Sequence, residues 1–364
     1  MLEEYKNHVI DREKQGLPPL PLNAEQTASL IELLKQKSRD DKPELLEILS
    51  NRVPAGVDQA AFVKAAFLND IASEKINLSI ISPVHAIVLL GTMLGGYNVQ
   101  ALVELLKTKH ADKAVKALSK ITLIFDAFYD VEELHKSGNI FATQLIQSWA
   151  DAEWFINKDK TPTIINAVVF RVEGEVNTDD LSPAQEAWSR ADIPLHSQSM
   201  LQNKIPQALD IINKLKEKKL PLVFVGDVVG TGSSRKSAIN SLQWHMGNSI
   251  DFIPNKNSGG IVLGNKIAPI FFNTAEDSGA LPIECDVSQL KMGDQIGIDI
   301  QNNKILNGEE ELCGFKLNPS TLLDELRAGG RIPLIIGRGL TEKARTSLNM
   351  KKTKVFITSI PQDK

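Results

Sequence analysis

The sequence predicts a chain of two parts, an all-helical domain followed by an α/β domain. Its length of 364 residues corresponds to two domains of ordinary size, or three smaller ones. Residues 1 to about 157 carry helix-capping signals and almost no strand pattern. After residue 158, short β-branched runs alternate with helical stretches, which is typical of an α/β domain.

The composition predicts a soluble globular protein and excludes several classes. Hydrophobic residues make up 42% and charged residues 24% of the chain, which suits a sizeable core. The formal charge of −4 argues against a strong nucleic-acid binder. No apolar run approaches the roughly 20 residues that cross a bilayer, and the charged start MLEEYKNHVIDREKQG lacks the apolar stretch of a secretory signal. The two cysteines, Cys285 and Cys313, form no CxxC metal knuckle. We therefore expect a cytoplasmic chain without a membrane segment or a metal site.

The first half is expected to fold into about seven short helices. Asn23 and Gln26 form a potential capping box before a helix over 24–37, and Ser82 with Pro83 opens a helix over 83–94. The other helices are expected at 43–51, 59–73, 98–107, 111–127 and 140–156. Short loops favour antiparallel neighbours, as in an α-solenoid or irregular bundle. Such a layer either presents a surface to partners or simply packs against the next domain.

The second half is expected to form a sheet with covering helices. Strands are predicted at 163–174, 220–227, 259–264, 281–288, 294–301 and 303–308, and helices at 198–218, 234–246, 266–275 and 319–328. The last two strands are separated by a short turn, which indicates antiparallel pairing late in the sheet. The basic tail after Gly339 is expected to be a linker.

A glycine-rich loop gives the strongest local signal. The strand at 220–227 runs into Ser233, Ser234 and Arg235 at a helix start, through glycines that permit a sharp turn: Gly226, Gly230 and Gly232. The N–H groups and dipole of a helix start favour an anion, and a guanidinium matches a carboxylate or phosphate. The alternative is a turn whose serines only cap the helix.

Familiar nucleotide and hydrolase motifs do not fit this loop. Arg235 stands where a P-loop and a dinucleotide fingerprint both need glycine. The nucleophile elbow G-x-S-x-G is not present. The loop therefore predicts a small-anion site with two hydroxyls and one guanidinium.

A second polar cluster follows the first strand of the α/β domain directly. It contains Asp179 and Asp180, which either support a site or cap a turn. Arg190, beside Trp188, is either a second anion clamp or part of a surface salt bridge.

These motifs together resemble a known family. The stretches NTDDLSPA, AWSRADIPLH, GDVVGTGSSRKSA, GNKIAPIFFNT and AGGRIPLIIGRGL are similar to the amino-terminal part of the bacterial aconitate hydratase B family. The resemblance covers essentially all 364 positions, including the stretch QSWADAEWF. It implies a HEAT-like all-α domain over 1–157, a swivel β/α domain over 158–348, and a linker over 349–364 toward a catalytic core.

The resemblance also implies an activity. Members are lyases of the tricarboxylic acid cycle that interconvert citrate and isocitrate through cis-aconitate, and bacterial members also hydrate 2-methyl-cis-aconitate. By position, Ser233 matches the catalytic base, and Ser234 and Arg235 match residues that hold a substrate carboxylate. Arg190 matches a further substrate-binding arginine, and Asp179 matches a supporting carboxylate.

The family's 4Fe–4S cluster needs three cysteines, and this chain has two. We therefore expect the chain alone to bind no cluster and to be inactive.

Two other functions stay open on the sequence. An interaction module could self-associate as a homodimer, or bind messenger RNA in the cluster-free protein, although the acidic balance argues against strong RNA binding. The basic run at 214–219 is explained more simply as a solvated helix end. A small subunit of the isopropylmalate isomerase type would share the swivel fold, but the long helical domain argues against it.

Overall fold

The computed structural model describes residues 2–36 and 40–357, and the chain separates into two compact units. The helical unit comprises the chain up to Lys158, the short segment Asp251–Pro254, and Ile335–Phe356. The sheet unit is formed mainly by Asp159–Ile250 and Asn255–Leu334. The predicted order, helices first and a mixed α/β part second, is confirmed.

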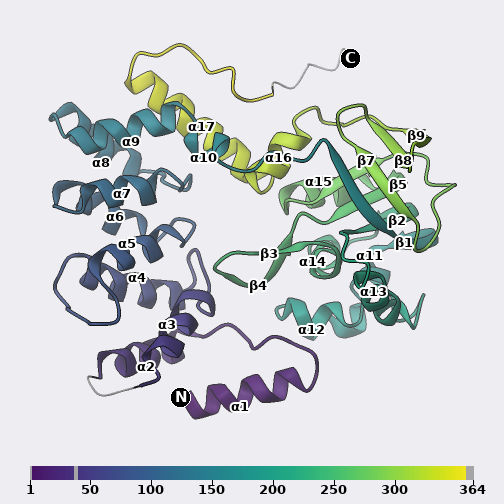
Figure 1. Cartoon of the computed structure of the whole chain (residues 1–364), viewed down its shortest axis with the longest axis horizontal. Coiled ribbons are helices and arrows are strands. Elements are labelled where there is room, and N and C mark those ends of the chain that lie inside the picture. Colours follow the sequence, from purple (N-terminus) through teal and green to yellow (C-terminus); the bar gives the residue numbers. More distant parts are fainter. Residues whose placement is uncertain (1, 37–39, 358–364) are drawn as a thin grey trace. The chain divides into compact units, whose positions relative to one another are not determined.

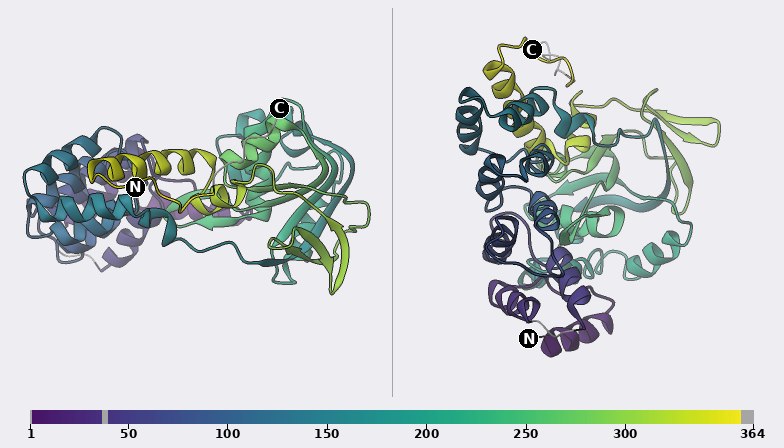
Figure 2. Two further views of the ribbon diagram at one scale, coloured as in Figure 1. Left: turned by 90° about the horizontal axis from the view of Figure 1, so that it is seen from above. Right: turned by 60° about the vertical axis from the view of Figure 1, so that its left-hand side comes forward.

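Short helices follow one another through the helical unit, and most of them pack on a helix one or two places along the chain (Figures 1 and 2). The capping box of Asn23 and Gln26 is present, and the Ser82 hydroxyl accepts a hydrogen bond from the His85 N–H, so both predicted helix starts are confirmed. The elements are α1 (Leu2–Glu13), α2 (Ala24–Lys35), α3 (Lys42–Asn51), α4 (Gln59–Ala72), α5 (Pro83–Gly91), α6 (Val99–Glu104), η1 (Leu105–Lys107), α7 (Ala111–Leu118), α8 (Ala127–Lys136), α9 (Ile140–Ala150) and α10 (Glu153–Ile156).

Several helix predictions in this unit need correction. The helix expected over 140–156 is interrupted at Ala152, which adopts a left-handed φ of 56° between α9 and α10. The helix expected over 111–127 ends at Leu118, and a separate helix, α8, begins at Ala127. The intervening segment is rich in β-branched residues, which lose side-chain freedom in a helix, and Phe125 adopts a left-handed φ of 48°. The helix expected over 24–37 is helical to Lys35, and residue 37 lies outside the described part of the chain.

Helix α17 (Arg331–Ser347) is not predicted by the sequence pattern. From Ile335 onward this helix belongs to the helical unit, whereas we had assigned residues up to 348 to the second domain. Trp154 explains the packing, because its indole Nε1 donates to Thr341 Oγ1 at 3.0 Å and its ring covers Gly337. The segment expected to begin a linker therefore starts as part of this unit, and residues 358–364 lie outside the described chain.

The sheet unit carries a seven-stranded mixed sheet with helices against it (Figure 1). Its elements are β1 (Ile164–Asn177), α11 (Thr178–Leu181), η2 (Ala184–Ser189), α12 (Ile193–Ser197), α13 (Ala208–Lys216), β2 (Leu222–Thr231), α14 (Arg235–Met246), β3 (Asn248–Ile250), β4 (Ile253–Ser258), β5 (Ile261–Ile267), α15 (Pro269–Asp277), β6 (Leu281–Glu284), β7 (Gln295–Asp299), β8 (Lys304–Asn307), β9 (Glu310–Gly314) and α16 (Leu322–Ala328). The small β3–β4 hairpin was not predicted.

The strand order is β6-β5-β2-β1-β7-β8-β9. The pairs β6–β5, β5–β2 and β2–β1 are parallel, and the remaining pairs are antiparallel, as expected for the late strands. Alternate residues of β1 enter two different cores: Val168 and Phe170 pack with α13, α14 and α15, while Val169 packs with the opposite cluster. Burial on both faces is typical of parallel strands and explains their continuous apolar runs.

A β-bulge interrupts the pairing of β1 with β2 near the carboxyl end of β1. Val172 pairs with Gly226 and Glu175 with Val228, so β1 contains one extra residue here. The Asp227 carboxylate fixes the bulge by accepting from the Gly174 N–H at 2.6 Å and from Arg171 Nη2 at 2.5 Å. The hydrogen bond from Arg171 lowers the pKa of Asp227 and keeps this carboxylate charged. A second register shift, between Val176 and Asn177, adds one residue to β2, so the two shifts cancel and Asn177 still lies opposite Thr231.

The helix expected over 198–218 is wrong in its first half. Residues 198–207 form turns, and helix α13 begins only at Ala208. Leu201 adopts a left-handed φ of 63°, and its N–H donates to the Asp180 carbonyl at 2.7 Å. This turn therefore ties the chain back to the polar cluster after β1.

Within residues 2–36 and 40–357, no helix is both long and apolar enough to cross a membrane.

Candidate active site

The two polar motifs of the sequence meet at one edge of the sheet. Asn177, the last residue of β1, lies opposite Thr231, the last residue of β2, and the two strands run parallel. Helix α11 therefore begins beside α14, and the two helices contact each other (Figure 1). The carboxyl ends of neighbouring parallel strands are where ligands bind in open α/β sheets.

Gly232 allows the two motifs to approach. It has a φ of 105°, and a Cβ at this position would lie 2.6 Å from Thr178 Oγ1. A residue with a side chain would push the loop after β2 away from α11. With glycine there, the Ser234 N–H reaches Thr178 Oγ1 at 3.1 Å, and the buried Thr178 holds the loop.

The Ser234 hydroxyl does not cap its helix. Ser234 is the N-cap residue of α14, but its side chain makes no capping hydrogen bond. Its Oγ instead accepts from Arg190 Nη2 at 2.9 Å. The structure therefore differs from the alternative in which the serines only cap, and it joins residues that are 44 positions apart.

The Arg190 guanidinium has one buried N–H group that is not used in any hydrogen bond within the described residues. Its Nε is shielded from solvent and has no hydrogen-bond partner among the residues that the structure describes. A buried N–H without a partner is unusual and calls for an explanation. Nε and Nη2 lie on one edge of a guanidinium, the edge that carboxylates bind in bidentate fashion. No salt bridge to Arg190 is found within the described chain, so the surface ion pair that we considered is not present.

Ser233 and Arg235 lie at the amino-terminal end of α14. Ser233 is exposed and precedes the N-cap, whereas Arg235 is half-buried and is the first helical residue. The helix extends for 12 residues, so its N-terminus carries the partial positive charge of a full helix dipole. A negative charge on the Ser233 oxygen, or on a bound carboxylate, would be stabilised here.

The Asp179 carboxylate takes no part in the hydrogen bonds that cap helix α11. The Asn177 side chain caps α11 by accepting from the N–H groups of Asp179 and Asp180, and Asp180 Oδ2 accepts from the Asn177 N–H at 2.9 Å. The capping role that we considered therefore falls to Asn177 and Asp180. Asp179 is exposed, and the capping interactions use its N–H but not its carboxylate.

Four residues of this site were missed by the sequence analysis. The buried imidazole of His196 lies 2.8 Å from Ser182 Oγ and 2.8 Å from Ser189 Oγ. Ser182 Oγ in turn donates to Ser237 Oγ at 2.7 Å. Burial and the nearby Arg190 charge lower the pKa of His196, so the ring is neutral at pH 7. The only sequence signal was a histidine and two serines close to Arg190.

The residues described here do not suit a metal cluster. Within the described part of the chain, no three His, Cys, Asp or Glu side chains are placed to hold a metal ion. Cys285 follows β6 and is buried, and burial raises the pKa of its thiol, as it does for Cys313 in β9. An iron–sulfur cluster binds thiolates, which this environment disfavours.

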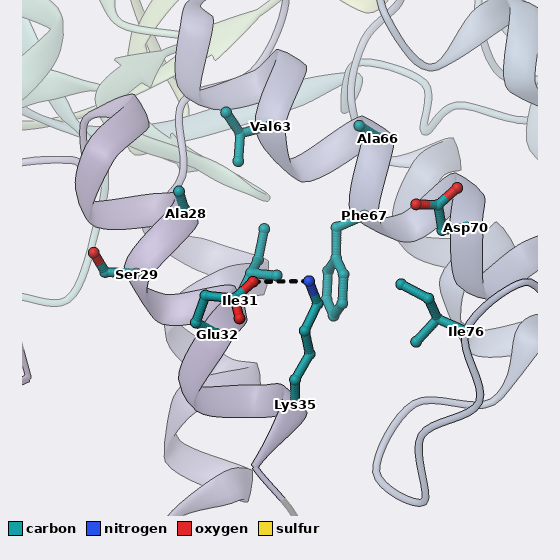
Figure 3. A pocket seen from close by; sticks show the side chains of 10 residues that line it. All are labelled: Ala28, Ser29, Ile31, Glu32, Lys35, Val63, Ala66, Phe67, Asp70 and Ile76. Carbon is teal, nitrogen blue, oxygen red and sulfur yellow. Dashed lines mark hydrogen bonds and ion pairs between the residues drawn. The ribbon is translucent and has the colours of Figure 1, made fainter.

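A separate hollow lies in the helical unit, between α2 and α4 (Figure 3). It has a volume of about 380 Å³ and is lined largely by apolar side chains such as Ile31, Val63 and Phe67. Its lysine, Lys35, is paired with Glu32 at 2.8 Å. None of the predicted site residues lines this hollow, and its two carboxylates, Glu32 and Asp70, outnumber its single lysine, so it offers no excess positive charge to an anion.

The site therefore has the features that an anion-binding edge of an α/β sheet needs: a helix N-terminus, an exposed serine and two arginines. Comparison with known proteins makes the family clear. The model of the family described as "Aconitate hydratase 2 N-terminus" matches residues 167–364, and "Aconitate B N-terminal domain" matches residues 4–155. The chain belongs to the aconitate hydratase 2 amino-terminal family, which confirms the resemblance seen in its motifs.

Individual relatives agree with this assignment. The chain is 57% identical to aconitate hydratase B of Synechocystis sp. over 98% of its own length, and 53% identical to that of Escherichia coli, also over 98%. The alignments cover 42% and 43% of these relatives, so the chain spans less than half of their length. A crystal structure of 3-isopropylmalate dehydratase (leuD) from Methanocaldococcus jannaschii matches with 21% identity and a TM-score of 0.37, over 50% of this chain and 99% of that one.

Proposed function

We propose that this chain is the amino-terminal part of an aconitate hydratase, a hydro-lyase that interconverts citrate and isocitrate through cis-aconitate. The relatives named aconitate hydratase B, which match over 98% of the chain, support this proposal. We assign the HEAT-like domain to 1–157, the swivel domain to 158–348 and a linker to 349–364, with the reservation that Ile335–Phe356 pack with the helices.

One observation supports the function most directly: Arg190 Nη2 contacts Ser234 Oγ at 2.9 Å. This contact unites the two motifs beside the exposed Ser233, and the buried Arg190 Nε has no partner in residues 2–36 and 40–357. A substrate carboxylate would satisfy that donor, and Arg235 offers a second guanidinium. A substrate with several carboxylates fits such a pair of clamps.

The chemistry assigns a role to each residue. Removal of water from citrate begins with loss of a proton from a carbon next to a carboxylate, which is a weak acid. We assign the acceptance of this proton to Ser233 Oγ, with Ser234, Arg235 and Arg190 holding substrate carboxylates and Asp179 supporting the site. A serine oxygen is a strong base only as an alkoxide, and the α14 N-terminus and Arg235 would stabilise that anion.

The family's 4Fe–4S cluster, when bound, supplies a Lewis acid for the departing hydroxyl. The residues described here do not fit such a cluster, so its ligands would come from other parts of the full-length protein. The part played by this chain is to bind, orient and deprotonate the substrate.

Three further assignments accompany this proposal. Hydration of 2-methyl-cis-aconitate would use the same clamps, because the methyl group leaves the carboxylates unchanged. We place the protein in the cytoplasm, where its two unpaired thiols would stay reduced. Self-association as a homodimer and binding of messenger RNA, the alternatives open on the sequence, have no observation in their favour among the described residues.

The test is a pair of substitutions in the full-length, cluster-loaded protein. Ser233→Ala should lower kcat by roughly 10² or more while changing KM little, as for a positioned acid–base group. Arg235→Lys should instead raise KM strongly, because an ammonium cannot replace a bidentate guanidinium. Ser249→Ala, an exposed serine of β3 in the same unit, serves as the matched control and should leave both constants unchanged.

Cluster absorbance and a thermal melt accompany the kinetics, so that a loss of activity can be separated from a loss of cluster or fold. An intact Ser233→Ala protein with near-normal kcat would overturn the assignment of the base. If Arg235→Lys also left KM unchanged, the loop would have no part in substrate binding.

A further inference from the structure

His196 joins two segments that lie far apart in the sequence. On one side its Nδ1 lies 2.8 Å from the hydroxyl of Ser189, the residue directly before Arg190. On the other side its Nε2 lies 2.8 Å from Ser182 Oγ, which reaches Ser237 Oγ in the first turn of α14 at 2.7 Å. The ring therefore links the Arg190 segment to the helix that begins with the Ser233–Arg235 loop.

The two ends of this link are themselves fixed. The Ser189 hydroxyl donates to the Glu186 carbonyl at 2.8 Å, and the Ser237 hydroxyl donates to the Ser234 carbonyl at 3.1 Å. His196 is 2% exposed, and Ser182 is fully buried. A neutral imidazole has one donor and one acceptor nitrogen. Its Nε2–H donates to Ser182, whose own proton goes to Ser237, and its Nδ1 shares the single Ser189 proton with the Glu186 carbonyl. Of the four residues in this chain of contacts, Ser182, Ser189 and His196 are buried and Ser237 is half-buried.

We propose that His196 is a positioning residue, which holds the Arg190 guanidinium against Ser234 in the orientation that receives a substrate carboxylate. This inference rests on the proposed function and adds a residue to it. His196 does not touch the substrate and acts through Arg190.

The physical need for such a link is clear from Arg190 itself. An arginine side chain loses about 2 kcal/mol of rotamer entropy when it is fixed in one orientation. If the segment carrying it is already held in place, less of that loss falls at the moment of substrate binding. A single hydrogen bond from Nη2 to Ser234 leaves the segment free to pivot, whereas the second attachment through His196 removes that freedom.

His245 supplies a matched control within the same unit. It is another histidine whose pKa is lowered by burial, to about 4, and its Nε2 lies 2.9 Å from the Ser197 carbonyl of helix α12. It contacts neither Ser182 nor Ser189. Replacing it should therefore lower stability in the way that any lost buried hydrogen bond does, without an effect on the substrate clamp.

The experiment is a double-mutant cycle on the full-length, cluster-loaded protein. His196→Gln reaches only one of the two serines and should raise KM for isocitrate about 10-fold, the effect of one lost hydrogen bond, with a smaller change in kcat. In an Arg190→Lys background, the same change should raise KM by less than about 2-fold, because the clamp is already lost. His245→Gln should leave KM unchanged in both backgrounds. If His196→Gln fails to fold, Ser182→Ala breaks the same link by removing one hydroxyl and is expected to show the same dependence on Arg190.

The outcomes separate this inference from the proposed function. An unsubstituted protein that does not convert citrate and isocitrate would overturn the proposed function together with the inference that depends on it. An active protein in which His196→Gln, or Ser182→Ala, raises KM by the same factor with and without Arg190 would overturn the inference alone. That result would assign His196 a purely structural role.

Discussion

Replacing a glycine of helix α17 by alanine should change the stability of the helical unit in opposite directions at two positions, Gly337 and Gly339. Gly337 is buried, and a Cβ there would lie 2.3 Å from the Trp154 ring. Gly339, two residues later, is exposed, and a Cβ there would meet nothing within 4 Å. Trp154 cannot easily move, because it is 4% exposed and donates to Thr341 at 3.0 Å.

The magnitudes follow from helix propensity and packing. Alanine is better than glycine in a helix interior by about 1 kcal/mol, so Gly339→Ala should stabilise the helical unit by about 0.5–1 kcal/mol. Gly337→Ala has the same benefit but places a methyl group far inside the favourable carbon–carbon distance of about 3.5–4.0 Å. Overpacking of this kind costs about 1–3 kcal/mol, so the net change should be a loss of about 1–2 kcal/mol. In melting temperature, these changes correspond to a rise of about 1–4 °C and a fall of about 2–8 °C.

The assay is thermal unfolding of the 364-residue chain followed by far-UV circular dichroism. Because the chain has two units, the transition of the helical unit is identified first, with a Leu30→Ala variant that destabilises only that core. Trp154→Phe, which shortens the ring system, should recover part of the loss in Gly337→Ala and destabilise the unsubstituted chain. A Gly337→Ala protein as stable as Gly339→Ala would refute the packing of α17 on Trp154.

Two further predictions concern pH and ligand binding. Burial and the neighbouring Glu325 raise the pKa of Glu276 to about 7, so its neutral form stabilises the fold in acid, and this contribution is lost as pH rises from about 4.5 through 7. Glu276→Gln should therefore stabilise the sheet unit at pH 8 by up to about 3 kcal/mol and have little effect at pH 4.5 in urea unfolding; an equal shift at both pH values would contradict this. The 364-residue chain should bind citrate only with a millimolar Kd, since two guanidinium contacts contribute about 1.5–3 kcal/mol each before the entropy of association is subtracted. Calorimetric titration should show weaker binding for Arg190→Lys; micromolar affinity independent of Arg190 would speak against the clamp.

Local rules explain why much of the fold could be predicted. Helix caps act within three or four residues, so Asn23 and Ser82 were recognisable from the sequence. The same holds for the loop after β2, where glycines precede a helix start. Helix α17 was missed because glycines normally argue against a helix interior, and Gly337 is tolerated only because a tryptophan 183 positions earlier occupies the space of its side chain.

The candidate site was predictable in its residues but not in its contacts. Asp179, Ser233 and Arg235 are polar and closely follow predicted strands, and this placement is visible in the sequence, whereas Arg190 lies farther from the strand, beside Trp188. Their convergence depends on the parallel pairing of β1 with β2, which no local pattern reveals. The network around His196 was missed for the same reason, since a buried histidine cannot be told from an exposed one before its partners are known.

The buried residues of the candidate site are neutral, whereas its charged residues are more accessible, and the cost of burying a charge explains this difference. The groups that position the site are neutral and buried: Thr178, Ser182, Ser189 and His196 are each less than 5% exposed. Charged groups in their place would lose their hydration and cost several kcal/mol each, whereas hydroxyls and a neutral imidazole need only one partner on each side. The groups that would meet a charged substrate are the opposite, because Ser233 and Asp179 are exposed and Arg190 and Arg235 are half-buried. Such a buried, neutral layer would hold the Arg190 segment through Ser189 while leaving the guanidinium accessible to a carboxylate.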